Sequence, residues 1–204
     1  MALMHQATIT PTKQELMAAW LPTREWYDGV VDRDPVASFR LDDPAGEVGV
    51  ECFLLGDAAG GGLFVPLTYR ADRLAGVDEI GVMEHSVLGT RYVYDGLLDP
   101  VCVGVLATAI ATGGTEAVEE VQAADGTRAV RDPGARARGT GTSAAVPDLG
   151  DVSVHDLAAT TVVRAGDVEL VVRRDLAADL AAAETLSVSW TGGTVDVAGL
   201  RPTR

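Results

Sequence analysis

The sequence predicts an α+β fold: an antiparallel sheet with two main helices, followed by a β-rich C-terminal part. Short β-type runs alternate with Gly- and Asp-rich turns along much of the chain, and two segments carry helix-capping signals. The chain has 204 residues, of which 47 % are hydrophobic and only 5 % aromatic. A core of small side chains is therefore expected, and a chain of this length needs no disulfide or metal to stabilise it.

The first helix is predicted within residues 7–22, after the end of a strand. Thr12 and Glu15 have the spacing of a capping box, in which each side chain satisfies a free amide of the other residue. Pro22 should end this helix because it has no N–H to donate. The expected apolar face of the helix consists of Leu16, Ala19 and Trp20.

Three strands are predicted next, over residues 36–41, 48–55 and 63–69. The last two should form a hairpin, because the Gly-rich residues 56–62 between them suit a flexible connection. Pro66 lies inside the last of these runs and cannot donate a ladder hydrogen bond. This predicts that the strand is an edge strand or is bulged.

Residues 80–94 predict a further extended pair, with Gly89 at its turn. The second helix should begin directly afterwards, because Asp99 is a good N-cap and Pro100 suits the first helical position. Gly113 is placed to end it. These elements predict one α+β domain over residues 1–114.

The remainder is expected to be less regular at first and then rich in strands. Residues 115–150 predict a weak strand, an Asp125–Gly126 turn and a flexible loop that lacks any apolar period. Residues 151–204 predict a β-rich part that could pack in the same domain. Its elements are strands over residues 160–164 and 168–173, an Ala-rich helix over 175–184, and a hairpin over 186–190 and 194–200.

Charge excludes several classes of function. The formal net charge is −14, and Lys13 is the only lysine. Nucleic acid and anionic membranes are not expected as partners, because binding them normally depends on Lys and Arg. Apolar runs are shorter than the ~20 residues of a membrane helix, and residues 1–6 show no signal peptide, so a cytoplasmic protein is expected. Cys52 and Cys102 lack zinc or redox spacing, and neither a metal nor a cofactor is predicted.

Two blocks of sequence resemble a known family, the N-terminal cap of maltokinases. The first block is His5, Thr8, Thr10–Lys13, Glu15–Leu16, Trp20–Thr23 and Trp26–Tyr27, and the second is His85–Gly96 with Asp99–Pro100. Together they frame residues 5–112, about half the chain. The resemblance implies that the antiparallel sheet is curved and cap-like. It also implies a link to actinobacterial α-glucan, maltose and trehalose metabolism, and the Ala-, Val-, Gly-, Asp- and Arg-rich composition fits a high-GC source.

The residues of kinase catalysis are not found. Phosphoryl transfer requires a strand lysine, a catalytic Asp with a downstream Asn, and a metal-binding Asp. Lys13 falls in a helix, and His155–Asp156 has no suitable Asn after it. Residues 158–174 resemble the first hairpin of a kinase lobe, but the nucleotide lysine of the family would fall near Leu170. The sequence therefore predicts a non-catalytic module that binds a sugar or a protein partner.

The candidate ligand-binding residues lie in or directly beside the same two blocks. They are Glu84, His85, Tyr92, Tyr94, Asp95, Trp26 and Tyr27. Tyrosines two apart on a strand share a face and could stack on a sugar, although core packing is the commoner role of such a pair. Adjacent strand residues such as Glu84 and His85 point to opposite faces.

An alternative hypothesis is a small enzyme with an unrecognised site around Glu84, His85, Tyr92, Tyr94 and Asp95. A third is self-association through a sheet edge, for example the hairpin over residues 186–200. The Gly-rich run at residues 60–62 lacks the Lys-Ser/Thr of a phosphate loop, and the run at 139–143 is not followed by a convincing helix. Both are expected to be flexible. Neither the ligand nor the oligomeric state follows from the sequence.

Overall fold

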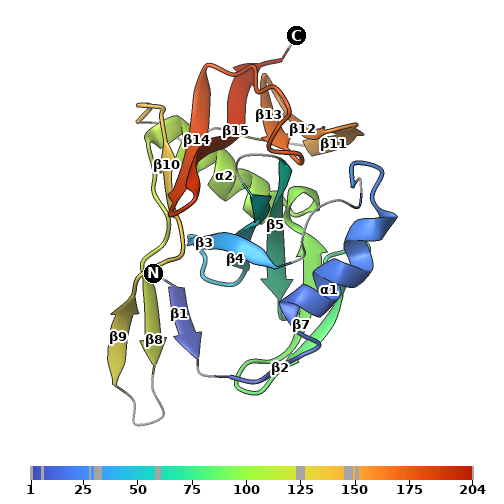
Figure 1. The fold of residues 1–204 in the computed structure, drawn as a ribbon, viewed down its shortest axis with the longest axis vertical. Coiled ribbons are helices and arrows are strands. Elements are labelled where there is room, and N and C mark those ends of the chain that lie inside the picture. The colour runs from blue at the N-terminus through green and yellow to red at the C-terminus, as the bar shows by residue number, and fades with distance from the viewer. Residues whose placement is uncertain are drawn as a thin grey trace.

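The structure is a computed structural model that describes residues 2–5, 7–27, 29, 34–57, 61–122, 127–144, 149 and 152–203. Within these ranges two α-helices pack with three β-sheets (Figure 1). The predicted α+β class holds in outline, although strands predominate over helices. Neither helix is long and apolar enough to cross a membrane, as judged from the described residues.

The first sheet is antiparallel and curls into a half-barrel, as the resemblance implied. Its strands, in spatial order, are β2 (Ile9–Thr10), β6 (Gly81–His85), β7 (Gly89–Asp95), β5 (Gly61–Arg70), β4 (Gly49–Asp57) and β3 (Pro35–Leu41). The predicted hairpins β4–β5 and β6–β7 both form. The prediction that Pro66 marks an edge or bulged strand is wrong, because β5 lies between β4 and β7 and pairs with β4 in continuous register through Pro66. Pairing with β7 covers only Leu67–Arg70, so Pro66 need not donate to that neighbour.

Helix α1 (Lys13–Trp20) packs on the concave face of the half-barrel, and the 3₁₀ turn η1 (Leu21–Thr23) follows it. The predicted capping box is present: the Thr12 amide donates to Glu15 Oε2 at 2.7 Å, and the Glu15 amide donates to Thr12 Oγ1 at 3.2 Å. Leu16 and Met17 are buried, whereas Ala19 is exposed, so the predicted apolar face is rotated. Leu16 lies over Gly81, where any side chain would come within 2.6 Å of it.

Helix α2 (Pro100–Thr112) packs on the opposite face of the first sheet, after the short turn η2 (Gly96–Leu98). Asp99 caps it by accepting from the Val101 amide at 3.0 Å, and Gly113 ends it in the left-handed conformation with φ of 70°. Both ends agree with the prediction. One buried apolar cluster joins α2 to the first sheet on one side and to a second sheet on the other.

The second sheet is also antiparallel and contains the C-terminal strands. Their spatial order is β10 (Arg136–Gly139), β14 (Glu184–Trp190), β15 (Gly193–Pro202), β13 (Val168–Arg173), β12 (Thr160–Ala165) and β11 (Val152–Leu157). The predicted hairpins form, and β11 was not predicted. The β14–β15 hairpin lies inside the sheet, because β10 pairs with β14 and β13 with β15. In the part of the chain that the structure describes, this hairpin is therefore not an edge of the sheet, although β13 pairs only with Ala198–Pro202 of β15.

Part of the predicted loop over residues 131–150 is ordered. Residues 136–139 form β10, and the segment after it crosses the end of α2. The Gly141 amide donates to Ile110 O at 2.9 Å, and the Ser143 amide donates to Ala111 O at 2.8 Å. The Gly-rich run at residues 139–143 thus satisfies helix C-terminal carbonyls that would otherwise lack partners. A Cβ on Gly139 would lie 1.8 Å from Ala109 O, which explains why glycine stands there.

The helix predicted over residues 175–184 does not form. The Asp175 carboxylate instead accepts from the Ala177 amide at 2.8 Å and closes a turn, a local bond that competes with helix formation. Leu176 is buried in the core, and its amide donates to Gly62 O at 2.7 Å. This segment therefore ties the second sheet to β5.

A small third sheet completes the fold. Strand β8 (Glu119–Gln122) pairs in parallel with β1 (Ala2–His5) and antiparallel with β9 (Arg128–Arg131). The strand predicted within residues 115–130 is thus present. The predicted Asp125–Gly126 turn lies outside the described residues.

Candidate functional site

The first sheet places alternate residues on two different surfaces. In β4, Val50, Cys52 and Leu54 belong to the cluster shared with α2, whereas Phe53 and Leu55 belong to a second cluster beneath α1. Glu51 and Gly49 lie on the same concave face of β4 as Phe53 and Leu55, but beyond the part of that face that packs against α1. At this end of the concave face, which α1 does not cover and which we call the open end, polar residues are present.

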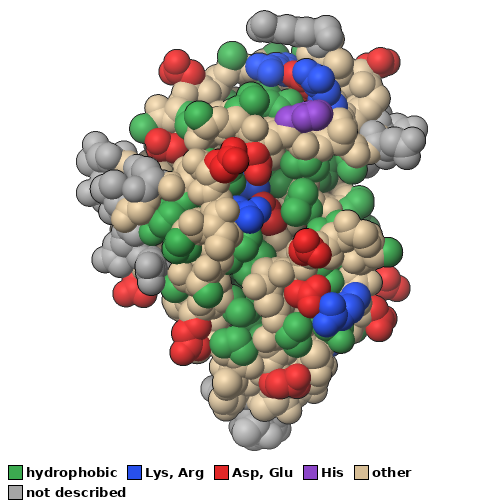
Figure 2. All heavy atoms as spheres, turned by 90° about the vertical axis from the view of Figure 1, so that its right-hand side faces the viewer, with side chains coloured by type: hydrophobic (Ala, Val, Ile, Leu, Met, Phe, Trp, Pro, Cys, Tyr) green, Lys and Arg blue, Asp and Glu red, His purple; other side chains and the backbone are tan. Residues whose placement is uncertain are grey.

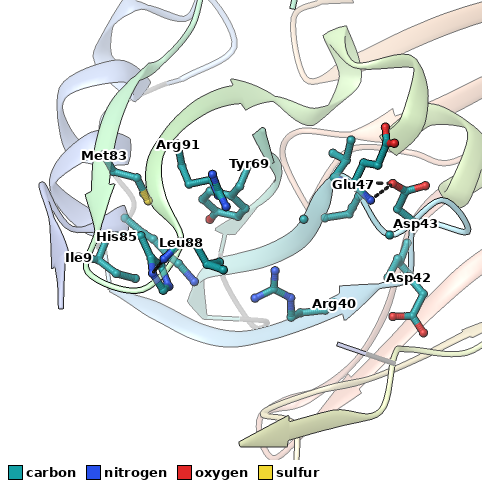
Figure 3. A pocket seen from close by; sticks show the side chains of 16 residues that line it. Ile9, Arg40, Asp42, Asp43, Glu47, Tyr69, Met83, His85, Leu88 and Arg91 are labelled. Atoms are coloured by element: carbon teal, nitrogen blue, oxygen red, sulfur yellow. Dashed lines mark hydrogen bonds between the residues drawn. The ribbon is translucent and has the colours of Figure 1, made fainter. Parts of the chain in front are cut away.

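A cavity of about 440 Å³ lies at this open end. It has the size of pockets that hold small molecules. Figure 3 shows the side chains that converge on it from β3, β6, β7 and the turn after β3. Its lining residues are Ile9, Lys13, Arg40, Leu41, Asp42, Asp43, Gly46, Glu47, Val48, Gly49, Val50, Tyr69, Met83, His85, Leu88 and Arg91.

A buried carboxylate lies between two cations at the wall of this pocket. Lys13 donates a hydrogen bond to Glu51 Oε2, and Arg40 Nη1 lies 3.9 Å from the same oxygen. Burial by itself would raise the pKa of Glu51, but the charges of Lys13 and Arg40 outweigh it and hold that pKa below its usual value. Glu51 is therefore ionised at neutral pH and orients both cations.

The guanidinium of Arg40 keeps most of its donors unused. Its side chain is only 18 % exposed, and among the described residues it makes no hydrogen bond through its side chain. It rests over Gly49, where a Cβ would lie 3.0 Å from Nη2. Arg91, on β7, is half-buried, and its Nη1 donates to the Thr90 carbonyl at 2.9 Å. Two arginines thus face the cavity with donors to spare.

His85 and Tyr69 form further parts of the wall. His85 Nδ1 accepts from the amides of Val87 at 3.2 Å and Leu88 at 3.0 Å, which fixes the β6–β7 turn and places Leu88 at the cavity. Burial, together with the nearby Glu51 charge, holds the pKa of Tyr69 well above its usual range. The Tyr69 hydroxyl is buried and makes no hydrogen bond of standard geometry. Lys13 Nζ lies 5.3 Å from the centre of its ring.

The far rim of the pocket is acidic, with Asp42, Asp43 and Glu47 on the turn after β3 (Figure 3). Asp43 accepts from the amides of Ala45, Glu47 and Val48 at 2.9–3.0 Å. Partial burial would raise the pKa of Asp43, but these bonds outweigh it and lower that pKa. Asp43 is thus committed to the turn. Figure 2 shows that acidic side chains are spread over the face it displays, so carboxylates at a rim are ordinary for this protein.

Of the seven residues predicted as a ligand site, the structure places only His85 at this pocket. Glu84 is exposed and accepts from the Thr90 hydroxyl at 2.9 Å. Tyr92 and Tyr94 share a face, but it is the opposite face of β7 from Arg91. Tyr94 is fully buried and accepts from the Leu74 amide at 2.8 Å, while Arg73 stacks on Tyr92 at 4.8 Å.

The remaining predicted residues lie at the closed end of the concave face. Asp95 is buried in an ion pair with Arg174 and accepts from the Leu97 amide at 3.1 Å. Trp26 is buried with the Arg174 guanidinium 4.7 Å from its ring centre, and Tyr27 packs partly buried on the α1 cluster. Arg174 is only 1 % exposed and also donates to the Thr161 hydroxyl at 2.8 Å. These contacts join the two sheets, while Trp26 Nε1 and Arg174 Nη1 stay buried without a hydrogen-bond partner in the described part of the chain.

The sequence patterns did not identify Lys13, Arg40, Glu51 and Arg91 as a group. A signal was present, because Glu51 and Arg91 alternate onto the same faces as the apolar residues Phe53 and Val93. No group of three or more His, Cys, Asp or Glu side chains in the described ranges is arranged to hold a metal ion. Burial raises the pKa of both thiols, Cys52 and Cys102.

Comparison with known proteins relates part of the chain to a protein family. Residues 20–99 match the family model of the maltokinase N-terminal cap domain. The matched range includes most of the first sheet and the pocket residues Arg40, Glu51, Tyr69, His85 and Arg91. It excludes α2 and the second sheet. No curated protein matches the chain significantly.

Proposed function

We propose that this chain, whose residues 20–99 match the maltokinase N-terminal cap domain, is a non-catalytic module that binds a small polar ligand in its half-barrel pocket. One observation carries the proposal: around one cavity, the concave face combines apolar residues with side-chain N–H groups that are available to donate to a ligand. The apolar residues are Ile9, Met83 and Leu88, and the donors belong to Arg40 and Arg91. Binding pockets generally combine an apolar lining with a few convergent polar groups.

Sugar-sized ligands are the first class to test, because the matched family is named for a maltose kinase. The hydroxyls of a sugar suit arginine donors, and its apolar ring faces suit Met83 and Leu88. A role in maltose–trehalose or α-glucan metabolism is part of this proposal. It rests on the family match, and a shared fold does not by itself transfer a function.

The alternative of a small enzyme has less support. Its five candidate residues do not converge: Glu84 is exposed, and Tyr94 and Asp95 are buried with their own partners. An active site requires reacting groups within hydrogen-bond reach of one substrate position. Leu170, at the position expected for a nucleotide lysine, is buried in the core between the sheets.

The proposal is tested by a thermal-shift screen followed by calorimetry. The panel contains maltose, trehalose, glucosamine, maltose 1-phosphate, ATP–magnesium and longer glucans. A ligand at a hundred times its Kd should add about 2.7 kcal/mol to the free energy of unfolding. Leu88→Trp should then reduce binding by filling the pocket mouth. Leu98→Trp is the matched control, because Leu98 is 38 % exposed, against 43 % for Leu88, and lies outside the pocket.

Binding that survives Leu88→Trp unchanged would place the ligand elsewhere and end the pocket proposal. A flat screen combined with capture of a protein from the native cell would favour the protein-partner hypothesis instead. ATP-dependent phosphorylation of a sugar by the pure protein would contradict the non-catalytic role.

A further inference from the structure

We infer that the ligand of this pocket carries an oxyanion, a phosphate or carboxylate group, and that Arg40 and Arg91 bind it. This inference rests on the proposed function and names the chemistry of the ligand. It is unexpected from composition, because a chain with a net charge of −14 should repel anions. Charge in the pocket is instead separated: the cations Lys13, Arg40 and Arg91 lie apart from the carboxylates Asp42, Asp43 and Glu47, which form the far rim.

The cationic end of the pocket holds more positive than negative charge, although the lining as a whole, with Asp42, Asp43 and Glu47 at the far rim, carries no net positive charge. Lys13, Arg40 and Arg91 contribute three positive charges, against which Glu51 places one buried negative charge. Lys13 donates a hydrogen bond to Glu51 Oε2, whereas Arg40 Nη1 lies 3.9 Å from the same oxygen and makes no hydrogen bond to it. Arginines elsewhere do pair closely: Arg70 is bidentate to Asp99 at 2.7 Å, and Arg174 pairs with Asp95. Cations with low exposure are normally paired in this way.

The placement of the two arginines suits one shared anion. Arg40 projects from β3 and Arg91 from β7, and both belong to the lining of the same cavity. Figure 3 shows their guanidinium groups directed towards the cavity from different walls. A guanidinium is a planar fork of donors that matches the oxygens of phosphate or carboxylate, and such charge-assisted bonds are about twice as strong as neutral ones.

The acidic rim restricts the class of anion. Asp42, Asp43 and Glu47 stand at the far end of the pocket, and the whole chain carries a net charge of −14. A polyanion such as nucleic acid would have to lie across these carboxylates. A small ligand can place one oxyanion at Arg40 and Arg91 and direct neutral hydroxyls towards the rim. The cavity of about 440 Å³ has room for such a molecule.

The test uses four probes that separate the anion from the sugar: glucose, glucose 6-phosphate, glucuronate and inorganic phosphate. Each is titrated into the whole chain by calorimetry, while NMR follows the arginine Nε–H resonances. Arg40 and Arg91 should shift saturably with both sugar anions. Glucose 6-phosphate or glucuronate should bind at least about tenfold more tightly than glucose. Inorganic phosphate should shift the same two resonances, with weaker affinity.

Variants then assign the effect to these side chains. Arg91→Gln should weaken binding of the anionic sugar about tenfold, and it leaves the Glu51 cluster intact. Arg40→Lys keeps a charge near Glu51 but loses the planar fork, so its effect should be smaller. Arg73→Gln removes an arginine outside the pocket, and its affinity should be unchanged.

Glucose binding as tightly as glucose 6-phosphate, with Arg91→Gln without effect, would overturn the oxyanion inference and leave the pocket proposal standing. Absence of any saturable shift at Arg40 and Arg91 with all three anions would also overturn it. If Arg73→Gln and Arg91→Gln lose the same amount of affinity for the anionic sugar, the effect is one of net charge in general. That result would refute the assignment of anion binding to the pocket arginines.

Discussion

At each end of the concave face an arginine lies beside a buried carboxylate, and the two ends differ in the other contacts that the arginine makes. At the closed end, Arg174 pairs with Asp95, bonds Thr161 and stacks on Trp26. At the open end, Arg40 lies 3.9 Å from Glu51 and makes no side-chain hydrogen bond within the described structure. Burial of an arginine therefore says little about its role until its donors are counted.

The difference has a physical cause in what covers each end. The Arg174 backbone bonds β5 through the Phe64 amide, at 3.1 Å, and the α1–η1 region brings Trp26 onto its guanidinium. At the open end, α1 contributes only its first residue, Lys13. The same sheet face is thus packed against the second sheet at one end, the sealed joint formed by Asp95, Arg174 and Trp26, and lines a cavity at the other. Mutations at the two ends should change different properties.

The largest expected effect is at the sealed joint. Arg174→Met leaves Asp95 as a buried charge without its partner, and should lower the free energy of unfolding by about 3–5 kcal/mol. Chemical denaturation followed by circular dichroism measures this loss. Asp95→Asn and the double variant complete a cycle: the double variant holds no unpaired buried charge, and its Asn can still accept from the Leu97 amide, so it should lose less than the sum of the single losses. If Arg174→Met alone does not fold, a folded double variant shows the same coupling. Additive losses would show that the ion pair is not coupled.

The second prediction separates stability from binding at the open end. Glu51→Gln removes the charge that orients Lys13 and Arg40, and should cost about 1–3 kcal/mol at pH 7. The pKa of Glu51 is lowered by folding, so this stabilisation is present above its unfolded pKa and disappears as the pH falls through the folded value. Denaturation of both proteins at pH 7 and pH 3 should therefore give a smaller difference at pH 3.

The same variant should bind an oxyanion several-fold more tightly, because a negative charge beside Arg40 is lost. Asp95→Asn is the control, since it also removes a buried carboxylate but at the sealed end. It should lower stability without changing affinity. If both variants weaken binding equally, the two ends of the face do not differ in function as described.

Most of the fold could be predicted from the sequence because its signals are local. The capping box of Thr12 and Glu15 and the N-cap of Asp99 each gave a correct helix start. The errors arose where distant contacts decide. Residues 136–143 resemble a linker by composition, yet they pair with β14 and close the end of α2. Asp175 starts no helix, because its segment is held against β5 and the core.

The site was harder to predict than the fold. Prediction relied on aromatic and acid–base residues that lie close in sequence, such as Tyr92, Tyr94 and Glu84. The pocket instead combines Lys13, Arg40 and Arg91, which are far apart in the chain and meet only because the sheet curls. Strand alternation gives the facing direction of each residue. Which part of a concave face stays uncovered depends on the placement of α1, which no local pattern specifies.

The smallest expected effect concerns His85, the one predicted site residue at the pocket. Its Nδ1 accepts two amides of the β6–β7 turn, so His85→Ala should lose about 0.5–1.5 kcal/mol of stability and let Leu88 move from the pocket mouth. His85→Asn can restore an acceptor to the turn and should recover most of the loss. Hydrogen exchange of the Val87 and Leu88 amides, measured beside ligand affinity, separates two roles. Faster exchange with a several-fold loss of affinity in His85→Ala, both recovered in His85→Asn, would show that His85 positions the turn. If both variants bind more weakly while hydrogen exchange in His85→Asn is unchanged, the imidazole itself contacts the ligand. The ligand site would then extend from the two arginines to β6.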